Sequence, residues 1–205
     1  MAQYPNFAAG GGVWTLEKQR VFQMGANWPG AGDFQSLAST TVGVSGSAGS
    51  ITFSSIPSLF KHLQVRVMAR TDRASTFDAS YIYFNGDTTL SNYSNHGSNG
   101  DGATANSFGY TTASAVGNQS TLILGASATA GIFGAFVLDI YNYTNTNQFT
   151  TTKTVGGVDL NGSGRIQFNS GTWFNTSAVT SITFTPVNTP NFTQYSSFAL
   201  YGIKG

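Results

Sequence analysis

The chain lacks cysteine and is poor in charge. Its 205 residues include no Cys, and only 8% are Asp, Glu, Lys or Arg, against about 25% in an average soluble domain. Without cysteine the chain has no disulfide framework, no thiolate ligand for zinc and no thiol nucleophile. Nine basic and eight acidic residues leave a net charge of +1, and we therefore expect no nucleic-acid partner.

Long apolar runs are also missing. No run of about 18 apolar residues occurs, so the sequence predicts no transmembrane helix and no membrane insertion. The first residues, MAQYPNFAAGGG, contain neither a basic nor an apolar region, and we expect no secretory signal. Small polar residues take the place of charge, since Ser, Thr and Asn make up nearly a third of the chain. Aromatic residues reach 14%, which argues against disorder.

Residues 1–33 differ from the rest and predict an N-terminal docking arm. Residues 8–12 form a flexible Ala/Gly spacer, after which Thr15 and Glu17 favour the start of a helix of about ten residues. An isolated helix this short is marginal in water, so it must dock on its own domain, a sister subunit or another protein. The residues that we expect to dock on a larger particle are Trp14, Leu16, Phe22, Met24 and Trp28.

From Phe34 onward, apolar and polar residues alternate, as is typical of half-buried antiparallel strands. The clearest runs are 50–54, 63–67, 81–84, 133–143, 166–168, 182–184 and 197–203. Asn-Gly and Gly-rich turn signals at 85–86, 99–102 and 161–164 separate some of them. The pattern predicts about eight to ten strands over residues 34–205, folded as an all-β, jelly-roll-like antiparallel β-sandwich.

Two stretches are predicted as loops, 71–80 and the longer 87–107. An irregular stretch as long as the second is typically either functional or disordered when it occurs in a compact domain. It holds Tyr93, His96 and Asp101.

Enzymatic chemistry has little support in the sequence. The two histidines, His62 and His96, come without a G-x-S-x-G nucleophile motif. No pair of the eight acidic residues stands out by spacing as a glycosidase pair, and no loop has the D-x-D-x-D-G order of a calcium site. We therefore expect no catalytic residue, no metal site and no cofactor.

Aromatic side chains are the remaining functional signal. Tyrosine and tryptophan rings stack on sugar faces, while Asn, Asp and Thr side chains hydrogen-bond sugar hydroxyls. The candidates for glycan binding are Tyr93, His96, Asp101 and Trp173. The alternative for Trp173 is a place in the core or in a subunit interface, because the 16 Phe residues indicate a large apolar core more readily than a binding platform.

Two stretches resemble virion proteins of tailed bacteriophages. Residues 11–17 (GGVWTLE), continuing to Trp28-Pro29, resemble a leader near the start of such proteins. Residues 157–204 resemble β-rich phage appendage proteins of the tail-fibre, head-fibre or capsid-decoration type. The resemblance implies a non-enzymatic structural component of the virion, assembled in the host cytoplasm and attached to other virion proteins. It supplies no catalytic residues.

Several functions are open at this point. The preferred one is a fibre or appendage protein docked by its arm, and the alternatives are a host-attachment module that binds a surface glycan and a capsid decoration protein. An enzyme acting on surface polysaccharide is the least favoured, because phage depolymerases are usually long β-helices. By analogy with phage fibres we expect a homo-oligomer, preferably a trimer, and the low charge suits close subunit packing.

Overall fold

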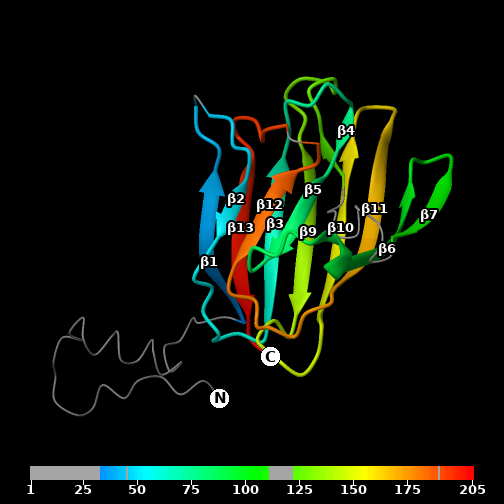
Figure 1. Ribbon diagram of the computed structural model, residues 1–205. Coiled ribbons are helices and arrows are strands. Elements are labelled where there is room, and N and C mark those ends of the chain that lie inside the picture. Colours follow the sequence, from blue (N-terminus) through cyan, green and yellow to red (C-terminus); the bar gives the residue numbers. More distant parts are fainter. Residues whose placement is uncertain (1–32, 45, 111–121, 189) are drawn as a thin grey trace, which may run out of the picture.

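The described part of the protein is an antiparallel β-sandwich. The computed structural model describes residues 33–44, 46–110, 122–188 and 190–205, and nearly all of its regular structure there is strand (Figure 1). The predicted all-β sandwich is confirmed. The one helical element in these residues is a 3-10 turn, η1 (Leu90–Asn92). The helix predicted for the arm, with its five docking residues, lies outside the described residues.

Thirteen strands are found in the described residues, more than the sequence predicts. They are β1 (Phe34–Thr41), β2 (Ile51–Phe53), β3 (His62–Ala69), β4 (Phe77–Asp78), β5 (Ser80–Phe84), β6 (Tyr93–Gly100), β7 (Ala105–Tyr110), β8 (Ile123–Leu124), β9 (Gly134–Tyr141), β10 (Thr150–Asp159), β11 (Gly164–Trp173), β12 (Ile182–Pro186) and β13 (Ser197–Ile203).

The two layers of the sandwich are unequal. One is an eight-stranded sheet in the order β1-β13-β3-β9-β10-β11-β6-β7, with every neighbouring pair antiparallel. The other is the three-stranded sheet β2-β12-β5, which lies in front of the large sheet in Figure 1. A two-stranded pair, β4-β8, completes the fold. We call the side of the large sheet that faces the small sheet its inner face, and the opposite side its outer face.

Alternating apolar residues build the core between the layers, as the sequence predicts. On β3, Leu63, Val65 and Val67 are buried, and on β9 the same holds for Phe136, Leu138 and Ile140. Phe184 of β12 joins the two sheets, since its ring lies 6.3 Å from that of Phe136 and 5.4 Å from that of Phe198. The apolar residues of β3 and β9 therefore follow the period-two pattern, which places one face of each strand in the core.

The predicted loop over 87–107 is wrong for most of its length. Residues 93–100 and 105–110 form the hairpin β6–β7, which extends the large sheet past β11 (Figure 1). The turn signal at 99–102 is correctly placed, because Asp101 caps the turn by accepting hydrogen bonds from the amides of Ala103 and Thr104. The strands escaped prediction because they consist largely of Ser, Asn and Gly, which carry no apolar alternation. The other predicted loop, 71–80, holds the short strand β4 and the start of β5.

Strand β11 is found where the sequence predicts it, but with its faces reversed. The alternation of Ile166 and Phe168 predicts that these side chains enter the core, as they do in other strands. Instead they point outward, with 65% and 51% of their surface exposed, whereas Gln167 and Asn169 point inward and are 8% and 3% exposed.

Candidate functional site

The four predicted glycan-binding residues do not form one site. Tyr93 and Trp173 are 2% and 1% exposed and stack on each other in the interior, with ring centroids 6.4 Å apart and planes 19° apart. Phe84 also packs against Trp173, with ring centroids 5.6 Å apart. Their faces are therefore covered by protein, and the core position weighed for Trp173 is the one that the structure shows.

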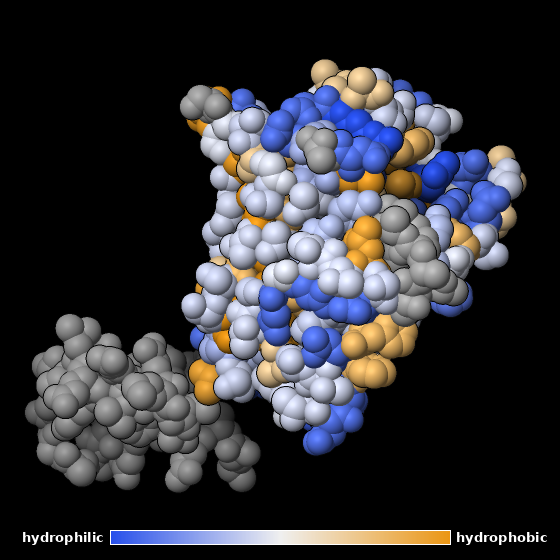
Figure 2. Space-filling model, in the orientation of Figure 1, coloured by the Kyte–Doolittle hydropathy of each residue, from blue (hydrophilic) through white to orange (hydrophobic). Residues whose placement is uncertain are grey.

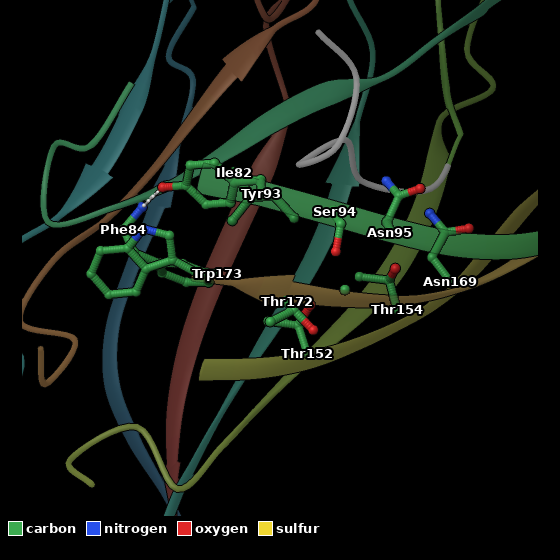
Figure 3. Close-up of a pocket in the computed structure, with 11 residues that line it drawn as sticks. Ile82, Phe84, Tyr93, Ser94, Asn95, Thr152, Thr154, Asn169, Thr172 and Trp173 are labelled. Carbon is green, nitrogen blue, oxygen red and sulfur yellow. Dashed lines mark hydrogen bonds between the residues drawn. The ribbon is translucent and has the colours of Figure 1, made fainter. Parts of the chain in front are cut away.

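A carboxylate at the edge of the core holds these rings in place. Asp87 accepts hydrogen bonds through Oδ2 from Trp173 Nε1 and Asn92 Nδ2, both at 2.8 Å. The Tyr93 hydroxyl donates a hydrogen bond to the backbone carbonyl oxygen of Asp87. It also accepts a hydrogen bond from the backbone amide of Phe84, which is the dashed line in Figure 3. Burial by itself raises the pKa of Asp87, but the hydrogen bonds from Trp173, Asn92 and Thr89 outweigh it and hold the pKa below its ordinary value.

The cavity beside the rings is too small for a sugar. Its volume is about 30 Å³, which accommodates a water molecule but no monosaccharide. Hydroxyl and amide side chains from the inner face of β10, β11 and β6 line it, among them Thr152, Thr154 and Asn169 (Figure 3). The inner face of β6, β10 and β11 therefore carries buried polar side chains beside the rings, which distinguishes it from the apolar core under β3 and β9.

The other two candidates lie apart from the rings. His96 is exposed on the outer face of β6, and its ring lies over Gly109 of β7, where an added Cβ would come within 2.6 Å of the imidazole. Asp101 is exposed at the β6–β7 turn, where backbone hydrogen bonds, first that from Thr104, hold its pKa below the ordinary value. The structure therefore separates the four residues into a buried pair, an outer-face histidine and a turn residue.

The outer face of the large sheet carries a group of exposed apolar side chains. Val137 of β9, Val155 of β10 and Phe168 of β11 are cross-strand neighbours in one row. Ile166 lies two residues from Phe168 on the same face, and Met68 projects from β3 beside Ala135. We call Met68, Val137, Val155, Ile166 and Phe168 the outer apolar patch. All but Val137 are among the most exposed large apolar residues of the described chain.

Polar groups border this patch on the β3 side. Asp139 accepts a hydrogen bond from Gln64 Nε2 at 2.8 Å, and Gln64 in turn accepts one from Arg66 Nε at 3.0 Å. The Arg66 guanidinium also lies over the ring of Tyr201, 5.2 Å from its centroid, and Lys153 lies over Tyr141 at 5.7 Å. Asp139, Arg66 and Lys153 therefore each contact a neighbouring side chain of this face.

A wide hollow adjoins the other side of the patch. It has a volume of about 710 Å³ and lies between the β6–β7 and β10–β11 turns. Because Val155, Gly157 and Ile166 line it, it opens on the outer face. Gly100 and Gly164 also line it, so its floor is largely backbone.

Among the described residues, neither a metal-ligand cluster nor a membrane-spanning helix is found. No three His, Cys, Asp or Glu residues in that part of the chain lie together as metal ligands would. No helix there is long and apolar enough to cross a membrane. Comparisons of the chain with protein-family models, with curated proteins and with solved structures give no match.

The sequence interpretation missed the outer apolar patch. Ile166 and Phe168 carry a strong strand signal, but the same signal fits either face of a sheet. No local signal in β11 distinguishes the two faces, because Gln167 and Asn169 alternate with the two apolar residues as they would in any half-buried strand. Only the pairing of β11 between β10 and β6 decides which set enters the interior.

Proposed function

We propose that the chain is a non-enzymatic structural component of a tailed-phage particle, of the fibre or appendage type. The observation that supports this most directly is the reversed polarity of β11, which exposes Ile166 and Phe168 and buries Gln167 and Asn169. A contiguous exposed apolar patch on a soluble domain marks an interaction surface. An assembly protein, whose faces are covered by other subunits, accounts for this arrangement better than an isolated enzyme does.

The rest of the surface fits the same role. The face that carries the small sheet shows mostly hydrophilic and intermediate residues, with apolar residues in separate small patches (Figure 2). With 8% charged residues in the chain, subunits can pack closely without removing many charges from water. The N-terminal arm, with Trp14, Leu16, Phe22, Met24 and Trp28, attaches this domain to other virion proteins.

A glycan-binding adsorption module is the second candidate, and the hollow between the two turns is what favours it. The hollow is large enough for a saccharide, and Asp101 and Asp159 are among the residues that line it. A capsid decoration protein would share the architecture of the first proposal and differ only in its place on the particle.

The test is to locate the chain in purified particles. We expect an image reconstruction of the virion to show density for this chain outside the shell or on the tail, with the arm against a neighbouring protein. A full-length variant with Trp14→Asp and Trp28→Asp should keep its fold by circular dichroism and fail to join the particle. Normal incorporation of this variant would refute the docking arm, and absence of the chain from purified virions would refute the structural role.

A glycan array separates the second candidate from the first. Binding of a host saccharide that is lost on Asp101→Ala and Asp159→Ala substitution would support an adsorption module. No binding at high protein concentration would leave the purely structural role as the better account.

A further inference from the structure

We infer that the outer face of the large sheet packs against the same face of a second copy of this chain, with the outer apolar patch of each copy seated in the hollow of the other. The inference deepens the proposed structural role, on which it rests, by naming a partner and a contact surface. Four observations carry it, namely the reversed polarity of β11, the pairing of a protrusion with a recess, the charge balance of the face, and its size.

The reversed polarity shows that the two faces of β11 have exchanged their usual environments. Inside a monomer, Gln167 and Asn169 need a hydrogen bond to compensate for burial, and they supply one to each other at 3.1 Å. Ile166 and Phe168 gain nothing from exposure to water. A partner that covered the outer face would remove Ile166 and Phe168 from water and so add to the stability of this strand.

The same face offers both a protrusion and a recess. Ile166 and Phe168 project from β11, and the hollow lies directly beside them over Gly157 and Gly100. At Gly157 the floor is closed to side chains, because an added Cβ would lie 2.7 Å from the carbonyl oxygen of Arg165. A surface with both features can meet a copy of itself about a two-fold axis, which is the requirement of an isologous interface and differs from the trimer expected by analogy with phage fibres.

The charges on this face cancel. Its strands carry Arg66 and Lys153 as cations and Asp139 and Asp159 as anions, two of each sign. The hollow is also lined by Arg165 and Asp101, which add one charge of each sign. Two copies of such a face meet without net repulsion, whereas a strongly charged partner would gain little from it.

The size of the face is sufficient for a stable contact. Eight strands spaced about 4.8 Å apart, each about eight residues long at about 3.3 Å per residue, span roughly 1,000 Å². A stable interface covers about 800 Å² on each partner. A second copy can therefore bury the outer apolar patch without using any other surface.

The primary experiment measures self-association of the full chain by sedimentation equilibrium. Ile166→Asp removes the protrusion, and Gly100→Leu fills the recess. At Gly100 an added Cβ meets nothing nearer than the Thr104 carbonyl oxygen at 3.7 Å, so this substitution fits the folded monomer. We expect each variant to weaken self-association at least roughly tenfold. Matched controls are Leu59→Asp, at an exposed apolar residue in the loop before β3, and Gly43→Leu, which adds the same side chain in open space.

The absence of native cysteine permits a second, geometric test. Ile166→Cys protein mixed with Gly100→Cys protein should form a disulfide-linked pair under mild oxidation, and Leu59→Cys in place of either partner should not. This readout does not depend on how stable each variant is, provided that circular dichroism shows both to be folded.

The outcomes divide cleanly. Loss of association in both face variants, with unchanged controls and a 100–166 cross-link, supports the inference. The inference would be overturned if the wild-type chain were monomeric, or if association survived both face variants. It would also be overturned if Gly100→Leu abolished the binding of a saccharide while association persisted. The proposed virion role is judged separately, because particle location and the arm variant decide it whether or not the faces pair.

Discussion

At the scale of single residues, Asp87 is the hydrogen-bond acceptor that satisfies the buried indole N–H at the edge of the aromatic interior. Trp173 is almost fully buried, and its indole N–H has Asp87 Oδ2 as acceptor at 2.8 Å. A buried donor without an acceptor costs about 1–3 kcal/mol. The same carboxylate also accepts hydrogen bonds from the side-chain amide of Asn92 and the backbone amide of Thr89. One side chain therefore links the turn after β5 to Trp173.

We therefore expect Asp87→Ala to lower the free energy of unfolding by about 1–3 kcal/mol, measured by urea denaturation. Trp173→Phe removes the donor, so the double variant should lose less than the sum of the two single losses. Strict additivity would show that the Asp87–Trp173 hydrogen bond does not contribute.

His62 makes the stability of the domain depend on pH. Its Nδ1 accepts the backbone amide of Asn142 at 3.0 Å, which requires an unprotonated nitrogen. Burial first, and then the nearby charge of Lys61, lower the pKa of His62 below 6.5. As the pH falls below 6.5 the unfolded chain takes up this proton first, so the folded state loses stability over that interval.

The variant His62→Gln should accordingly show a flatter dependence of unfolding free energy on pH between about 7 and 5. His96→Gln is the matched control, since His96 is exposed on β6, and it should retain the wild-type slope. An unchanged slope in His62→Gln, measured by chemical denaturation across this range, would contradict the assignment.

At the scale of elements, one arginine holds the segment that joins β8 to β9. Arg70 donates through Nη1 to the carbonyl oxygens of Thr129 and Ile132, and through Nη2 to those of Ala126 and Ala128, over distances of 2.6 to 3.1 Å. The planar fork of a guanidinium can bind four carbonyls together, and a lysine ammonium cannot reproduce that geometry.

Arg70→Lys should thus loosen residues 126–132 while the charge of the chain stays the same. We expect faster amide hydrogen exchange there, and little change in β3 and β9, measured by mass spectrometry. Arg66→Lys, on the outer face, serves as the control. Equal protection of residues 126–132 in wild type and Arg70→Lys would show that other contacts hold the segment.

The elements also show what can be predicted from one sequence. Strands β3, β9, β12 and β13 were predictable because their apolar residues alternate and the inward set is buried. The hairpin β6–β7 was not, since strands of Ser, Asn and Gly form there through pairing with β11 and not through local preference. Face reversal in β11 was also beyond local patterns, because it depends on which strands lie beside it and what covers them.

The candidate site was harder to predict than the fold for the same reason. Tyr93 and Trp173 are 80 residues apart in the chain, and only the pairing of β6 with β11 brings them together, in the interior. Residue type alone could not distinguish a sugar platform from a core stack. Asp101 was predicted in a turn from the Asn-Gly-Asp-Gly signal, and that local feature is found as expected.

At the scale of the whole molecule, scarcity of charge determines how association should respond to salt. On the outer face the two cations and two anions cancel, and burial of the outer apolar patch supplies the driving force. Screening therefore has little net repulsion or attraction to remove. We expect the self-association constant to stay within about threefold between low and 1 M NaCl, and to increase in sulfate, which strengthens apolar burial.

Lys153→Glu tests the charge balance directly. It changes the face from two positive and two negative charges to one positive and three negative, so two copies would repel each other. Association should weaken at low salt and recover as NaCl is raised, because screening suppresses the repulsion between exposed like charges. Sedimentation equilibrium at both salt concentrations measures this, with Lys61→Glu, placed before β3, as a control of equal charge change. If Lys61→Glu weakened association as much as Lys153→Glu, total charge and not the outer face would control assembly.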